Sequence, residues 1–99
     1  MAMMYKIEYI STFHFDVLDV VSDLEEYPQK AKRIFEKLDR ILNALGRTPE
    51  MYPIYEDYPD FRKISVEDYL IFYRVNKRDN IVEVHRLVYG GRDIKKLLE

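Results

Sequence analysis

Residues 62–89 read RKISVEDYLIFYRVNKRDNIVEVHRLVY, and this stretch decides the fold. Polar and apolar residues alternate from Arg62 to Val66, which predicts a strand. The run from Tyr69 to Val75 is apolar on both faces and predicts a central strand. Residues from Ile81 to Tyr89 return as a further strand, and the short polar links between the three runs predict tight turns. The stretch therefore predicts three consecutive antiparallel strands.

The chain before this stretch predicts one more strand and a first helix. Residues alternate from Tyr5 to Tyr9, which indicates a short strand. A helix is expected from about Phe13 to Tyr27, with Ser11 or Thr12 as its N-cap and Asp16 opposing the helix macrodipole in its first turns. The apolar stripe of this helix consists of Val17, Val20, Val21 and Leu24.

A second helix is expected from about Gln29 to Leu45, directly after Pro28, because apolar residues recur at three- and four-residue spacing. Gly46 would end it as the C′ residue, and the short link between the helices predicts an antiparallel helical hairpin. The segment Thr48–Asp60 has three prolines and three tyrosines; it is either a lid or binding element or, by default, the path from the helices to the sheet. A short helix from about Arg92 to Leu98 would finish the chain.

Together these elements predict an α+β fold in a single domain, residues 1–99. The sheet, antiparallel or mixed, combines the N-terminal strand with the three C-terminal strands, and the helical hairpin covers one of its faces. A chain of 99 residues can bury one two-layer core, which excludes a large enzyme with separate cofactor and substrate domains. The sequence has no apolar run near the ~18 residues of a membrane span and no signal peptide, so we expect a cytoplasmic protein without a membrane partner.

Residue counts argue against most cofactor and metal chemistry. The chain has no Cys, which excludes a disulfide framework, a thiol nucleophile and a Cys-ligated metal. With only His14 and His85 available, no zinc site is expected, and no glycine-rich phosphate loop is present. We therefore expect no cofactor. His85, with Glu83 and Leu87 on its own side of a strand, is either a proton carrier facing a cleft or, more commonly for such a residue, a packed or surface histidine.

Charge is distributed unevenly along a chain whose net charge is -2. Residues 1–61 carry 7 basic and 12 acidic side chains, whereas residues 62–99 carry 9 basic and 6 acidic ones. The basic stretch of the second helix is interpreted as a solvated face. The strands and the C-terminal segment carry a basic and phenolic set: Arg62, Lys63, Arg74, Arg86, Tyr89 and Arg92.

This set is open to two interpretations. Arginines beside a tyrosine can stabilise phosphate charge while the phenol carries a proton, which is the chemistry of metal-free RNA cleavage. The same residues can be structural groups held in salt bridges. Spacing alone favours the structural interpretation.

Three segments resemble the RelE/ParE toxin superfamily of type II toxin-antitoxin systems: Phe61–Ile64, Tyr69–Val75 and the ending Val88–Leu98, with its Tyr-Gly-Gly-Arg-Asp-Ile motif. The resemblance covers nearly the whole chain, and its C-terminal part is the specific part. It implies the two-layer fold described above and a toxin that is neutralised by a cognate antitoxin wrapped around it. RelE-like members of the superfamily cut messenger RNA in the ribosome, whereas ParE-like members poison DNA gyrase without being nucleases.

The resemblance also separates the two branches. The nuclease branch implies an arginine at Arg62 and a His or Tyr at Tyr89, and both are present. Its second arginine is absent because Leu70 stands in that place, so Lys63, Arg74 or Arg86 would have to substitute for it from other positions. In the nuclease reading the catalytic residues are Arg62, Arg86, Tyr89 and Arg92. Leu70, the net charge, a pI near 5.7 and the motif of the ending together favour the ParE-like branch.

Three functions therefore remain open. The first is a gyrase-directed toxin that acts by binding, with Arg86, Tyr89, Arg92 and the last helix contacting the target or the antitoxin. The second is a ribosome-dependent messenger RNA endoribonuclease, so that whether the chain is an enzyme depends on the branch. The third is an inactive binding module of the same fold. In all three cases we expect an antitoxin to cover exposed apolar surface, because tyrosine is enriched at interfaces.

Overall fold

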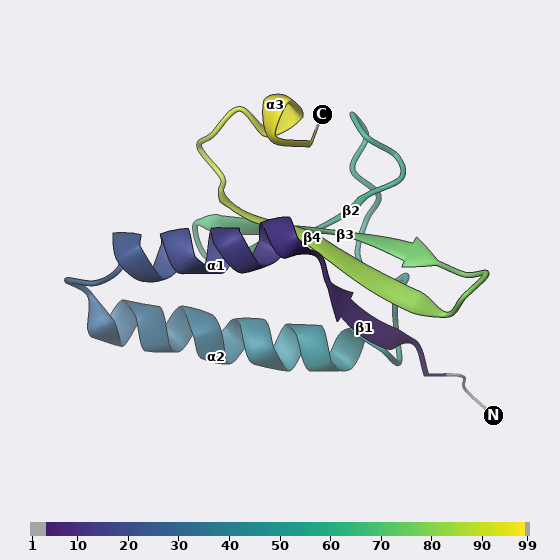
Figure 1. Cartoon of the computed structure of the whole chain (residues 1–99), viewed down its shortest axis with the longest axis horizontal. Coiled ribbons are helices and arrows are strands. Elements are labelled where there is room, and N and C mark those ends of the chain that lie inside the picture. Colours follow the sequence, from purple (N-terminus) through teal and green to yellow (C-terminus); the bar gives the residue numbers. More distant parts are fainter. Residues whose placement is uncertain (1–3, 99) are drawn as a thin grey trace.

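The computed structural model describes residues 4–98 and has the predicted order of elements (Figure 1). The elements are β1 (Lys6–Tyr9), α1 (Ser11–Asp23), α2 (Pro28–Leu45), β2 (Arg62–Val66), β3 (Tyr69–Asn76), β4 (Ile81–Tyr89) and α3 (Ile94–Leu98). The predicted α+β fold is confirmed. No helix of residues 4–98 has the length and apolarity that crossing a membrane requires.

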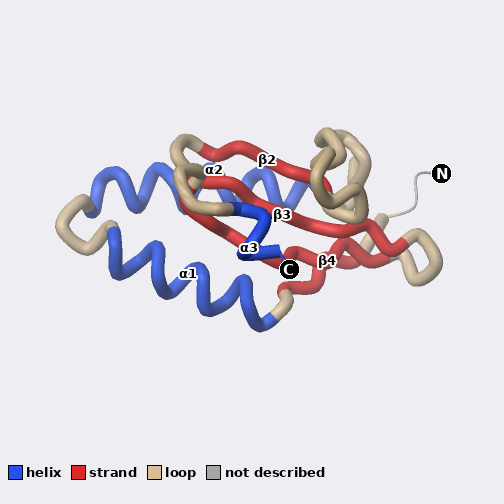
Figure 2. Tube along the Cα trace, turned by 90° about the horizontal axis from the view of Figure 1, so that it is seen from above, coloured by secondary structure: helices blue, strands red, loops and turns tan. Residues whose placement is uncertain are grey.

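The four strands form one mixed sheet in the order β1-β4-β3-β2. β1 runs parallel to β4, whereas the β2–β3 and β3–β4 pairs are antiparallel. α2 lies under one face of the sheet, and α1 lies along the side of β4 (Figure 2). α3 and the segment 48–61 lie on the opposite side of the sheet from α2 (Figure 1). The helical hairpin therefore covers one face as predicted, with α1 at the edge of the sheet.

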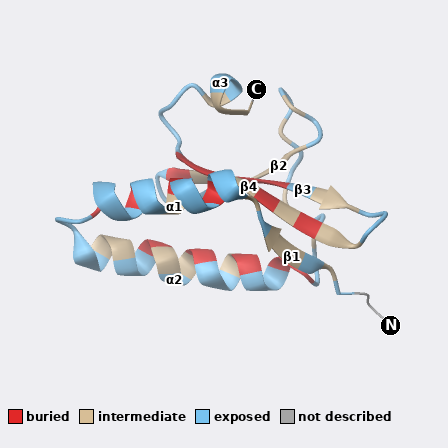
Figure 3. Cartoon of the chain, viewed as in Figure 1, coloured by how far each residue is buried: buried red, intermediate tan, exposed pale blue. Residues whose placement is uncertain are grey.

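The main core lies between the sheet and the two long helices. Its innermost members include Ile34 and Leu45 from α2 and Ile71, Val82 and Val84 from the sheet, all without measurable exposure. The side of α2 that faces the sheet is buried or half-buried, and the opposite side is exposed (Figure 3). This arrangement follows from the three- and four-residue spacing of the apolar positions in α2. Burying each such side chain contributes roughly 1.5–3 kcal/mol.

The segment 48–61 covers part of the other face of the sheet. Phe72 is fully buried there, and the Tyr55 ring meets it edge-on with centroids 5.2 Å apart. Tyr55 also stacks on Tyr58, and the Lys63 ammonium lies 5.6 Å from the Tyr55 ring centre. The tyrosines of this segment thus pack against the sheet and against one another. The default interpretation of the segment, as a path that reaches the sheet, agrees with this packing.

A β-bulge in β4 changes which side chains face the helices. Tyr73 pairs with Val84, but its neighbour Phe72 pairs with Arg86, so His85 is an extra residue on β4. The bulge shifts the alternation, and Leu87 joins the core on the helix side. The expectation that Leu87 shares a side with His85 is therefore wrong.

Helix ends differ from expectation in three places. Ile10, not Ser11 or Thr12, precedes α1, and no side chain caps that helix. α1 ends at Asp23, and Pro28 is the first residue of α2, where its missing N–H costs nothing. Gly46 has a right-handed φ of -60°, so it is not the left-handed C′ residue we expected. A Cβ on Gly46 would lie 2.8 Å from the Tyr5 carbonyl oxygen, and this close approach of the chain before β1 is what requires glycine there.

Candidate functional site

The site is built around β4, which continues beyond the end of β1. β1 pairs with β4 only as far as Val84, so the next residues of β4 lack a strand neighbour on that side. Side chains of α1 take over this role: the Thr12 hydroxyl donates to the His85 carbonyl at 2.9 Å, and the Asp16 carboxylate accepts from Leu87 N–H at 2.9 Å. Thr12 and Asp16 are four residues apart and therefore lie on one face of the helix. That face completes the hydrogen bonding of the sheet edge.

Asp16 also forms an ion pair with Arg86, which corrects the role expected for it. Its Oδ2 accepts from Arg86 Nε at 2.7 Å and its Oδ1 accepts from Nη2 at 3.0 Å. Asp16 is 7% exposed and is the one buried charged residue among residues 4–98. A carboxylate in this position needs partners for both oxygens because water cannot solvate it. Asp16 lies beyond the first turn of α1, and its role is that of a buried partner of Arg86 and Leu87 rather than the expected counter-charge to the helix macrodipole.

Arg86 connects this pair to the C-terminal helix. Its Nη1 donates to the Leu97 carbonyl at 2.7 Å, on the other side of the guanidinium from Asp16. An open cavity of about 250 Å³ lies beside this contact, between α3 and β4. The cavity is lined by Thr12, Phe61, His85, Arg86, Leu97 and Leu98.

His85 lies beside this cavity and is mostly packed. Its Nε2 is 3.2 Å from Glu83 Oε1, and its ring meets Phe61 edge-on with centroids 5.1 Å apart. The guanidinium of Arg74 also lies over the Phe61 ring, 5.8 Å from its centre. These contacts match the packed-histidine interpretation.

Tyr89 and Arg92 lie at the far end of β4, where the chain leaves the sheet. Tyr89 is 51% exposed and meets Tyr69 edge-on with centroids 6.1 Å apart. Its ring lies over Gly91, where a Cβ would come within 2.8 Å of a ring carbon. Arg92 is exposed, and it lines the same hollow as Tyr69, Tyr89 and Asp19. Tyr89 and Arg92 thus form a solvent-accessible phenol and guanidinium at the base of the C-terminal segment.

Arg62 is the first residue of β2 and holds the segment 48–61. Its Nη1 donates to the Tyr52 carbonyl at 2.7 Å and to the Glu50 carbonyl at 3.2 Å. Beside it the Tyr73 hydroxyl donates to the Pro49 carbonyl at 2.8 Å, and burial raises the pKa of this phenol to about 12. Arg62 therefore lies among main-chain carbonyls that it satisfies.

The register of the sheet separates Arg62 from Tyr89. Arg62 pairs with Tyr73, and Tyr89 pairs with Tyr69. Four residues of β3, roughly 13 Å at about 3.3 Å per residue, therefore lie between the two positions, in addition to the width of the strands. The structure brings Tyr89 close to Arg92 and Arg86 close to α3, and it does not bring Arg62 to either group. No cluster of His, Asp or Glu suited to a metal ion occurs within residues 4–98.

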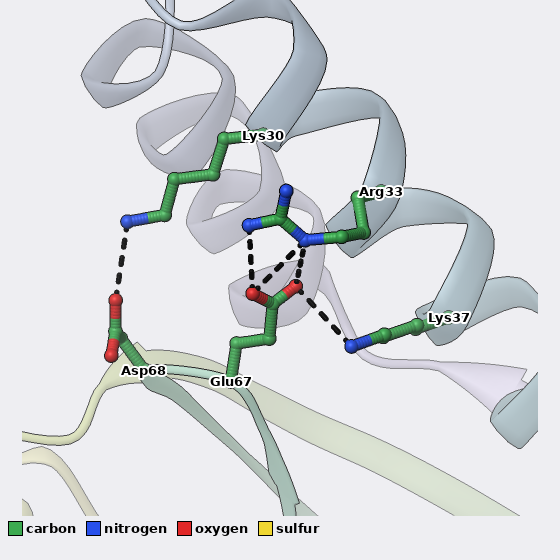
Figure 4. Close-up of polar contacts among 5 residues, drawn as sticks. All are labelled: Lys30, Arg33, Lys37, Glu67 and Asp68. Atoms are coloured by element: carbon green, nitrogen blue, oxygen red, sulfur yellow. Dashed lines mark hydrogen bonds and ion pairs between the residues drawn. The ribbon is translucent and has the colours of Figure 1, made fainter.

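Cations of α2 form a second polar cluster with the turn between β2 and β3 (Figure 4). Glu67 has a φ of 54°, in the left-handed region that costs a non-glycine residue about 1 kcal/mol or more. Arg33 donates hydrogen bonds to the Glu67 carboxylate from Nε, at 2.9 Å to Oε2, and from Nη2, at 2.9 Å to Oε1. The Lys37 ammonium lies 3.6 Å from Oε2. The Arg33 hydrogen bonds lower the pKa of Glu67. Lys30 binds Asp68 at 3.1 Å, so part of the basic stretch expected to be a solvated face holds this turn instead.

The same turn contacts the start of the C-terminal segment. Gly90 N–H donates to the Asp68 carbonyl at 2.8 Å. α2, the β2–β3 turn and the glycine pair after β4 are therefore linked in one chain of contacts.

An apolar surface runs over α1 and the groove beside it. Phe15, Leu18 and Val21 are 67%, 64% and 51% exposed. Next to them is an open groove of about 300 Å³ between α1 and α2. It is lined by Tyr9, Phe13, His14, Val17, Phe35, Leu38, Asp39 and Leu42. Exposed apolar surface of this kind marks an interaction site more often than free surface.

A strand, two helices and three strands in a mixed sheet, closed by a C-terminal helix over the last strand, make up the fold of the chain. Two solved structures share it. The chromosomal ParDE toxin-antitoxin system from P. aeruginosa matches with a TM-score of 0.72 and 13% sequence identity, covering 87% of this chain and 96% of that chain. The RelBE2 toxin-antitoxin complex from Mycobacterium tuberculosis matches with a TM-score of 0.65 and 14% identity, covering 90% of this chain and 94% of that one.

The sequence match is more specific than the fold. The family described as "ParE toxin of type II toxin-antitoxin system, parDE" matches residues 14–94, and the chain belongs to this family. The resemblance to the RelE/ParE superfamily is thereby confirmed, as is its assignment to the ParE side. A comparison with curated proteins gave no match.

Proposed function

We propose that this toxin acts on DNA gyrase by binding and that the end of β4, with Tyr89, Arg92 and α3, contacts the target. One observation carries the proposal: the residues that an RNA-cleaving site would need do not converge. Arg62 and Tyr89 are separated by four residues of β3, and Arg86 is occupied by Asp16 and the Leu97 carbonyl. Metal-free phosphate cleavage needs its charge and its proton carrier at one phosphate.

The alternative, a ribosome-dependent endoribonuclease, keeps Arg62, Arg86, Tyr89 and Arg92 as its catalytic residues. The pair Tyr89 and Arg92 is the part of that set which the fold holds together. On the gyrase proposal the same two residues make contacts rather than catalyse. Both activities lie in the cytoplasm, where we place the toxin.

The test is induction of the toxin without an antitoxin, with DNA supercoiling and messenger RNA integrity followed in the same cells over minutes. We expect a DNA damage response with intact messages. Truncation after Gly91 should abolish toxicity, whereas Arg62→Ala should leave it unchanged if the protein still folds. Early translation arrest with cleaved messages, lost in both Arg62→Ala and Tyr89→Phe, would establish the nuclease instead. Normal growth at verified soluble expression would leave an inactive binding module.

We also propose that an antitoxin covers the apolar surface of α1 and the adjoining groove. The similar structures are a ParDE system and a toxin-antitoxin complex, which supports a partner of this kind. Leu18→Glu should weaken antitoxin binding by about thirtyfold or more, the loss typical of a central apolar contact. Ser65→Glu, an exposed change on the edge strand β2 and away from α1, is the matched control. Equal binding by both variants, measured by calorimetry, would place the antitoxin elsewhere.

A further inference from the structure

Main-chain contacts help to hold the C-terminal helix on the rest of the protein. None of the described residues 94–98 is fully buried, and Ile94, Leu97 and Leu98 are only half-buried. Two carbonyls of α3 accept hydrogen bonds instead: Leu97 from Arg86 at 2.7 Å, and Lys95 from the Tyr58 hydroxyl at 3.3 Å. No side chain of α3 is fully buried, so these polar contacts act together with three partly buried apolar side chains in setting the position of the helix.

Arg86 makes the shorter of these two contacts, and Asp16 fixes the orientation of its side chain. Asp16 binds it through two nearly parallel hydrogen bonds, and Asp16 is itself held by Leu87 N–H. The Arg86 side chain is 18% exposed. A bidentate pair of this kind fixes the plane of the guanidinium, so Nη1 points at one place whether or not α3 is there. The acceptor at that place is the Leu97 carbonyl.

We propose that Arg86 is a positioning residue: it fixes α3 on β4 and so sets the orientation in which Arg92, Lys95 and Lys96 meet the target. Arg86 itself touches neither gyrase nor a phosphate. The fixing of α3 stands on the contacts above, whereas its consequence for the target rests on the proposed function. The two parts are tested by separate readouts.

Mobility of α3 is the first readout. Since the chain has no Cys, the single substitution Lys96→Cys gives one site on α3 for a nitroxide spin label. We expect an immobilised spectrum in the parent. Arg86→Lys keeps a positive charge beside Asp16 but lacks the planar fork that bridges Asp16 to Leu97. The ratio of docked to undocked α3 should fall on the order of tenfold, with a mobile component in the spectrum. Arg74→Lys, an arginine on the neighbouring strand without a bond to α3, should leave the spectrum unchanged.

A second variant removes the charges together. In Asp16→Asn/Arg86→Leu the Asn carbonyl can still accept from Leu87 N–H, and no unpaired charge is left inside the protein. This double variant should fold, as judged by a single thermal transition, and should also release α3. An immobilised label in a folded double variant and in Arg86→Lys would overturn the proposal.

Toxicity is the second readout. On our proposal it falls in Arg86→Lys in step with the docked fraction, whereas Arg92→Ala loses toxicity with α3 still immobilised. Full toxicity in a variant whose label is mobile would refute the positioning role. If truncation after Gly91 leaves toxicity intact while the label is mobile in Arg86→Lys, the proposed target surface fails and Arg86 still holds α3.

Discussion

Replacing Asp16 by alanine removes the carboxylate that links α1, β4 and, through Arg86, α3. Two groups lose their partner at once. Arg86 keeps its charge in a position that is 18% exposed, and Leu87 N–H is left without an acceptor beside the end of β1. Asp16→Ala should therefore destabilise the protein far more than the loss of an ordinary surface acid.

The size of the effect follows from these two losses. Removing one partner of a buried ion pair costs about 3–5 kcal/mol, and the lower end applies because Arg86 retains some access to water. An unsatisfied buried N–H adds about 1 kcal/mol. The expected loss is about 4 kcal/mol, which for a domain of this size lowers the melting temperature by roughly 16–30 °C.

Urea unfolding followed by circular dichroism measures this loss. Asp19→Ala is the matched control, since Asp19 is an exposed acid on the same helix, and it should change stability by less than about 0.5 kcal/mol. Asp16→Asn should fall between the two because its side chain can still accept from Leu87 N–H. A loss below about 1 kcal/mol in Asp16→Ala would show that the pair contributes no more than a surface salt bridge, and the account of the β4 edge would be wrong.

Three further predictions concern other parts of the fold. The pKa of Glu67 is lower in the folded protein than its usual value of 4.5, so the ionised Glu67 carboxylate stabilises the fold at pH values above 4.5, and this contribution is lost as the pH falls through the lowered pKa. The stability difference between the parent and Glu67→Gln, measured by urea unfolding at several pH values, should therefore shrink on acidification. Tyr73→Phe leaves the Pro49 carbonyl without its donor and should cost about 1 kcal/mol in the same assay. Gly46→Ala places a Cβ against the Tyr5 carbonyl and should cost about 1–3 kcal/mol, whereas an unchanged melting temperature would show that the chain before β1 moves freely.

Local patterns in the sequence predict most of the fold. The period of two in the strands and the three- and four-residue spacing in α2 predicted every element in order, because these patterns reflect which face of each element is buried. The bulge in β4 was missed, although a signal exists: Val84 and Leu87 are both apolar and an odd number of residues apart, which strict alternation does not allow. The sequence predicts a left-handed conformation for Gly46, but what requires glycine there is the Tyr5 carbonyl, which comes from a segment more than forty residues earlier.

The site could be predicted only in part, because its contacts also join segments that are far apart in the sequence. Arg86 was selected for its charge, but its partner Asp16 lies 70 residues away, and no local pattern pairs them. Asp16 does lie on the buried face of α1, between Phe13 and Val20, and a charged residue on a buried face indicates a buried partner. Grouping Arg62 with Tyr89 required knowledge of the register, which a single sequence does not contain.

The docking of α3 through main-chain carbonyls has a consequence for how such a toxin diversifies. A carbonyl is present whatever amino acid occupies the position, so substitutions at Lys95 or Leu97 leave the acceptors for Tyr58 and Arg86 in place. The outward side chains of the helix can therefore change from one lineage to the next while its attachment is inherited unchanged. On the proposed function, in which α3 contacts the target, single substitutions on the outward side of the helix can change specificity without detaching it.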